Sequence, residues 1–160
     1  MWIWVPLPTR WSTGADQPDT KPDMFLPAFT LAHWCILIAA LLPIVCAGIA
    51  KSGTMRTPRR DGGYDNHDPR AWMARQGDWR ARANNAQINS FEALPFFFAA
   101  VLTAQHLQAA PLSLDLLALA FVLLRVVYIY CYVTDKASSR SIVWTLAFLV
   151  NVVILFLGFR

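Results

Sequence analysis

Residues 82–98 contain polar side chains that could bind a ligand or take part in catalysis, and they lie beside a strongly apolar run of sequence. Asn85, Asn89 and Glu92 recur at spacings of four and three residues, so a helix places all three on one face. A charged residue at the centre of a membrane helix costs about 2.5 to 3.5 kcal/mol, and such residues usually face a bundle interior or a cavity. We therefore expect Glu92 to have a buried partner.

A second polar stripe lies in the third apolar run, where Arg125, Tyr128 and Tyr132 share a helix face by the same spacing. Counted at about 1.5 Å per residue from the helix ends beside the charged loops, Glu92 and Arg125 lie at matching depth. One interpretation is a buried pair that fixes the register of two helices. The other is an anion site, which the nearby Arg140 favours.

The elements that must position these side chains are membrane helices. The 160-residue chain is 56% hydrophobic and 15% charged, which is too apolar for an ordinary soluble domain. Four segments reach the roughly 20 apolar residues that cross a bilayer: 25–50, 83–106, 114–133 and 141–159. They predict an all-α integral membrane protein with a four-helix transmembrane bundle, forming one domain over residues 24–160.

Residues 1–23 differ from the rest, and they lack the basic start and apolar core of a signal peptide. We expect them to form a disordered or extra segment, with Met24 as the natural start. No metal site is predicted, because no Cys-x-x-Cys or His-x-x-x-His spacing occurs. Asp65, His67 and Asp68 lie close in sequence, but the pattern of a calcium-binding loop is absent.

The charge distribution predicts the orientation in the membrane. Residues 51–82 carry eight Lys and Arg against four Asp, whereas residues 106–113 carry no Asp, Glu, Lys or Arg. Positively charged loops remain in the cytoplasm, so the first and third loops are expected there and both termini on the other side. Since these cations lie between spans and not on a folded basic face, no nucleic-acid partner is expected despite the net charge of +4.

Three motifs, in this order, resemble the MAPEG family, whose members act as membrane-associated proteins in eicosanoid and glutathione metabolism. They are A-Q-x-N-x-x-E-x-x-P at residues 86–95, R-x-x-Y-x-x-x-Y at residues 125–132, and the pair Arg140-Ser141. The resemblance covers roughly residues 27–158 and indicates a bacterial-type member, which implies the bacterial inner membrane.

The resemblance implies a homotrimer that binds glutathione between neighbouring subunits at the cytoplasmic end, as a co-substrate and without a metal. Eukaryotic members usually have an arginine where this chain has Asn85, so a contact to a glutathione carboxylate is missing unless Arg82 or Arg80 replaces it. The positions that match the family's glutathione contacts are Gln87, Asn89, Glu92, Tyr128, Tyr132, Arg140 and Ser141.

Glutathione carries two carboxylates, an ammonium group and a thiol, and adjacent positive charge favours its thiolate. We assign Arg140 to the thiolate, Tyr128 to the sulfur or the electrophile, and Asn89 with Tyr132 to the peptide backbone. Glu92 is assigned to the ammonium group or to ordering Arg125. The predicted function is a glutathione transferase or peroxidase acting on lipophilic electrophiles that arrive through membrane lipid.

Two alternatives remain. A non-catalytic family member that binds lipid or acts as a scaffold is favoured by Asn85 in place of arginine. A small transporter or channel component is disfavoured, because the polar stripes occupy only one half of each span and leave no continuous polar path.

Overall fold

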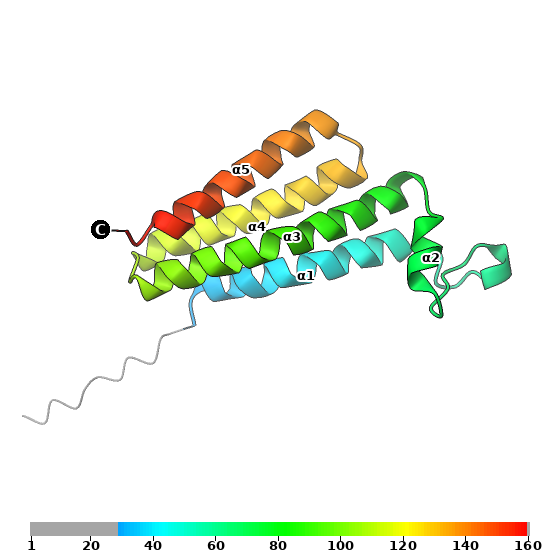
Figure 1. Ribbon diagram of the computed structural model, residues 1–160, viewed down its shortest axis with the longest axis horizontal. Helices are drawn as coiled ribbons and strands as arrows, with labels where there is room; N and C mark the ends of the chain where they lie inside the picture. Colours follow the sequence, from blue (N-terminus) through cyan, green and yellow to red (C-terminus); the bar gives the residue numbers. More distant parts are fainter. Residues whose placement is uncertain (1–28, 160) are drawn as a thin grey trace, which may run out of the picture.

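The computed structural model describes residues 29–159, which form helices joined by short loops and one longer loop. Four helices are long: α1 (Leu31–Lys51), α3 (Asp78–His106), α4 (Pro111–Val133) and α5 (Ala137–Phe156). They lie side by side along one axis, with α1 and α5 on opposite sides of α3 and α4 (Figure 1). The predictions for residues 1–23, for Met24 and for the first part of the first span lie outside the described residues.

Three of the long helices, α1, α4 and α5, are long and apolar enough to cross a membrane, with mean hydropathies of 2.2, 2.3 and 1.9. The described residues contain no strand, so the prediction of an all-helical membrane protein is confirmed. Helix α3 carries the polar stripe and does not reach the same hydropathy, although its 29 residues extend about 43 Å. A fourth crossing by α3 stays a prediction.

Small side chains let α1 and α3 approach each other closely. Ala32, Cys35 and Ala39 of α1 are buried in the same core cluster as Ala100 and Ala104 of α3. Small residues at such positions allow close backbone contact between helices in a membrane, where van der Waals packing drives association. This close packing fixes the position of α3, which carries much of the site.

The loop between α1 and α3 has more structure than the sequence indicated. It contains a 3₁₀ turn, η1 (Arg59–Asp61), and a short helix, α2 (Pro69–Ala74). Asp68 caps α2, since its Oδ1 accepts a hydrogen bond from the backbone N–H of Ala71 at 3.1 Å. Asp65 likewise accepts one from the N–H of His67 at 3.0 Å. Both aspartates thus cap neighbouring backbone groups.

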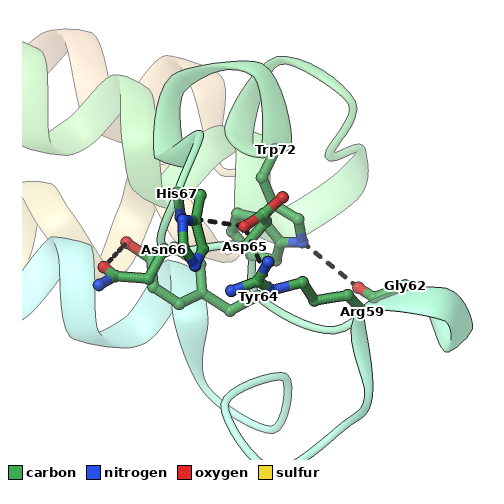
Figure 2. A network of polar contacts seen from close by, with 7 residues as sticks. All are labelled: Arg59, Gly62, Tyr64, Asp65, Asn66, His67 and Trp72. Carbon is green, nitrogen blue, oxygen red and sulfur yellow. Dashed lines mark hydrogen bonds and ion pairs between the residues drawn. The ribbon is translucent and has the colours of Figure 1, made fainter.

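Side chains from both ends of this loop hold it together (Figure 2). Arg59 Nε lies 3.3 Å from Asp65 Oδ1, and the indole N–H of Trp72 donates to the carbonyl of Gly62 at 3.3 Å. Trp72 is buried, and the ring of Tyr64 packs edge-on against it. The backbone N–H of His67, and then the Arg59 guanidinium, lower the pKa of the Asp65 carboxyl.

The two charged loops lie at the same end of the molecule. The segment with α2 and the turn between α4 and α5 are at one end, whereas the turn between α3 and α4 and the C-terminal end lie at the other (Figure 1). This arrangement is the one that the predicted topology requires. The side of the membrane that each end faces stays a prediction.

Candidate functional site

Arg125 lies at the centre of the polar groups between α3 and α4. Its side chain is buried, with an exposed fraction of 3%. One guanidinium nitrogen, Nη1, donates to Asn89 Oδ1 at 3.1 Å, and Nη2 donates to Ser90 Oγ at 3.0 Å. The guanidinium also lies 4.4 Å from the centre of the Tyr128 ring, a favourable cation–π distance. The cation is therefore held by neutral groups on two helices.

Glu92 does not contact Arg125 directly, so the predicted buried pair needs correction. Glu92 is exposed, and its Oε2 accepts a hydrogen bond from Asn89 Nδ2 at 3.2 Å. Arg125 forms no ion pair within residues 29–159. The two charges are linked through the amide of Asn89. Glu92 and Arg125 lie at equal depth along their helices, but the side chain of Glu92 does not point toward Arg125.

An outer cavity of about 260 Å³ gathers most of the predicted glutathione contacts. Arg140 and Tyr132 stack there, with the guanidinium 4.4 Å from the ring centre, and Tyr132 meets Tyr128 edge-on at 5.6 Å. A half-buried cation, two phenols and an amide thus line one space at the charged-loop end of α3, α4 and α5. The lining residues are Asn89, Tyr128, Tyr132, Arg140, Ser141, Trp144 and Thr145.

Three predicted contacts, Glu92, Gln87 and Arg82, do not line the outer cavity. Gln87 lines a different cavity of about 570 Å³, together with Lys51 and Arg70, on the side of α3 that faces the α1 end and α2. Arg82 is bound to the end of α4: its Nε donates to the carbonyl of Val133 at 3.1 Å, and its Nη1 lies 3.8 Å from Asp135 Oδ2. A cation at a helix C-terminus interacts favourably with the helix dipole. Arg82 therefore supports the end of α4, and its contact with glutathione stays a prediction.

The structure adds residues that the sequence did not single out. Ser90 is buried and anchors Arg125, and its only sequence signal is a hydroxyl beside the polar stripe. Trp144 lines the outer cavity and also an inner cavity of about 200 Å³. Asn151 lines the inner cavity, and its buried Oδ1 accepts no hydrogen bond within the described residues.

These features define a helical membrane protein with a polar, cation-containing pocket at one end of its long helices. Residues 31–160 match the family model of the MAPEG family, so the chain belongs to this family. Comparisons with the curated proteins and with the solved structures found no match. Membership confirms the resemblance on which the expected site was based, and it supports a membrane role related to glutathione or eicosanoid metabolism.

Proposed function

We propose that the protein is a membrane glutathione transferase or peroxidase, which conjugates glutathione to lipophilic electrophiles or uses glutathione to reduce them. The observation that carries this proposal is the outer cavity, in which Arg140 stacks on Tyr132 beside Tyr128 and Asn89. A guanidinium keeps its charge in a partly dehydrated site and lowers the pKa of a neighbouring thiol. The exposed carboxylate of Glu92 lines the inner cavity and is bonded to Asn89, which lines both cavities, and we assign it to the glutathione ammonium group.

The proposal includes a homotrimer in a bundle of four membrane crossings per subunit, with the charged loops in the cytoplasm. Gln87 supports assembly, because it lies away from the outer cavity of its own chain. It reaches a shared glutathione only if that ligand lies between two copies. The exposed apolar side chains of α1 and α5 suit contact with lipid or with a neighbouring subunit.

A second candidate function is a non-catalytic family member that binds lipid or serves as a scaffold. One observation favours it: both arginines named as replacements for the family arginine at Asn85 already contact other groups of their own chain. Arg82 binds the end of α4. Arg80 donates to the carbonyl of Ser52 at 3.2 Å and stacks on Trp79 at 4.3 Å. One carboxylate contact to glutathione would then be missing.

Arg140→Leu separates the two candidates. If Arg140 holds the thiolate, turnover with an aryl halide should fall by about a hundredfold or more, while glutathione binding weakens much less, because the interaction grows as sulfur loses its proton. Arg140→Lys should retain part of the activity. Arg75→Leu, an exposed arginine in the first loop, is the matched control. Equilibrium binding and turnover are measured on the detergent-solubilised protein.

A protein that binds glutathione without turnover would be the scaffold. Wild-type turnover in Arg140→Leu would contradict the assignment of the thiolate to Arg140. Absence of glutathione binding in the parent protein would contradict the proposed function altogether.

A further inference from the structure

An inner cavity lies between α3, α4 and α5, deeper than the outer cavity along the helices. Its volume is about 200 Å³, and it shares Asn89 and Trp144 with the outer cavity. The remaining lining is apolar and aromatic except for the side chains of Glu92, Arg125 and Asn151. An engineered apolar cavity of about 150 Å³ is known to bind benzene, so this one has room for a substituted ring. The aromatic side chains that line it are Phe96, Phe121, Trp144 and Phe148.

One wall of the inner cavity carries a hydrogen-bond acceptor without a donor. Asn151 is buried, with an exposed fraction of 2%, and its Oδ1 has no partner in the described residues. Leaving a buried acceptor unpaired is destabilising, and nearly all such groups in folded proteins have a partner. An amide in an otherwise apolar segment of α5 is accounted for if a bound molecule supplies the missing donor.

The side chain of Arg125 has N–H groups that are not used in hydrogen bonds within the described residues. A guanidinium has five N–H groups, and two nitrogens of Arg125 each donate one hydrogen bond, to Asn89 and Ser90. Arg125 also lines the inner cavity. Arg125 and Asn151 thus present hydrogen-bond donors and an unpaired acceptor to the same cavity of about 200 Å³. A ligand group that pairs with both residues must be able to donate and to accept.

We propose that the inner cavity is a binding site for a ring-sized lipophilic molecule that carries a hydroxyl or hydroperoxy group. The O–H donates to Asn151 and an oxygen accepts from Arg125, while the ring packs on the aromatic wall. Trp144 and Phe148 are 43% and 45% exposed on α5, so in the single chain the cavity lies beside an exposed apolar surface of α5.

This site goes beyond the proposed function, because its occupation does not require glutathione. Its position beside the outer cavity would place a bound hydroxyl or hydroperoxy compound next to the proposed thiol. Selection for a group that both donates and accepts distinguishes it from a general apolar crevice, which binds according to apolar area alone.

The test compares three ligands of similar shape: para-cresol, which donates and accepts, 4-methylanisole, which only accepts, and toluene, which does neither. Saturable binding to the detergent-solubilised full chain is measured by calorimetry, with empty micelles as the reference. We expect para-cresol to bind about tenfold more tightly than toluene, the factor that one or two net hydrogen bonds supply. The 4-methylanisole should not reproduce this gain.

Asn151→Leu should remove the preference for para-cresol, and Asn84→Leu, on the other side of α3 in the cavity beside Gln87, should leave it unchanged. Ala147→Val, which narrows the inner cavity, should weaken all three ligands and serves if Asn151→Leu does not fold. Equal binding of the three ligands, or an unchanged preference for para-cresol in Asn151→Leu, would overturn the proposal. Absence of saturable binding would also overturn it, because it would indicate that only water occupies the cavity.

The same titration with saturating glutathione separates this site from the thiol site. Retained para-cresol binding supports two adjoining sites, and displacement by glutathione would show that the inner cavity is part of the glutathione site. If glutathione itself fails to bind while para-cresol does, the proposed function fails and the inner site stands.

Discussion

Ser90→Ala tests the buried arginine network most directly. The Ser90 hydroxyl, 2% exposed, accepts from Arg125 Nη2 at 3.0 Å and donates to the carbonyl of Ala86 at 2.7 Å. Its removal leaves an N–H of a buried cation unpaired. Hydrogen bonds to charged groups contribute about 1.5 to 3 kcal/mol, so the substitution should lower the free energy of unfolding by about 2 kcal/mol. Reversible unfolding in mixed micelles, followed by far-ultraviolet circular dichroism, measures the change.

The chain offers a matched control in Ser141→Ala. The Ser141 hydroxyl also donates to the carbonyl four residues earlier, that of Ala137 at 3.2 Å, but it is exposed and accepts nothing from Arg125. A surface change of this kind stays within about 0.5 kcal/mol.

The double variant Ser90→Ala with Arg125→Leu isolates the interaction. Without the cation, the cost of Ser90→Ala should fall close to that of the control, because no buried charge is left unpaired. An equal cost for Ser90→Ala and Ser141→Ala would refute the reasoning. A full cost that persists beside Arg125→Leu would show that Ser90 acts through some other contact.

Two further predictions concern the charged-loop end. Arg82→Leu should lower the free energy of unfolding by about 0.3 to 1 kcal/mol without weakening glutathione binding, since Arg82 supports the end of α4. A loss of glutathione binding without a loss of stability would show that Arg82 contacts glutathione. Asp65 has its pKa lowered by the His67 N–H, so its contribution to loop stability is present above the unfolded pKa and is lost as pH falls through the folded pKa. Hydrogen exchange of the loop, corrected for intrinsic rates, should become faster in acid, whereas this pH dependence should be absent in Asp65→Asn, which has no carboxyl group to titrate.

Apolar runs and charge were sufficient to predict the long helices, because each run is a local property of the sequence. Contacts between distant segments were not predictable in this way. Asp115 lies within the third apolar run, and its Oδ1 accepts from the backbone N–H of Ala32 at 2.8 Å, at the start of α1. The partner is 83 residues away, and no local spacing marks it. The carboxylate supports a helix end where one of the first N–H groups lacks an intrahelical partner.

The site shows which features helical spacing can predict and which it cannot. A helix turns about 100° per residue, so Asn89 and Glu92 differ by about 60° around α3. Asn89 faces Arg125, and Glu92 is turned far enough away to be exposed and linked only through the amide. Spacings of three and four therefore predicted which residues share a broad face, while the depth argument alone was insufficient to predict which of them touch.

The same geometry bears on Gln87. It lies two residues before Asn89, which is about 200° around the helix, so the two side chains point to nearly opposite sides of α3. They line different cavities accordingly. Both match the family's glutathione contacts, and one helix cannot present both to one ligand from a single copy. Either Gln87 has no part in binding or the ligand lies between subunits; Gln87→Leu should therefore weaken glutathione binding only in the assembled protein, and an identical loss in isolated subunits would exclude a shared site.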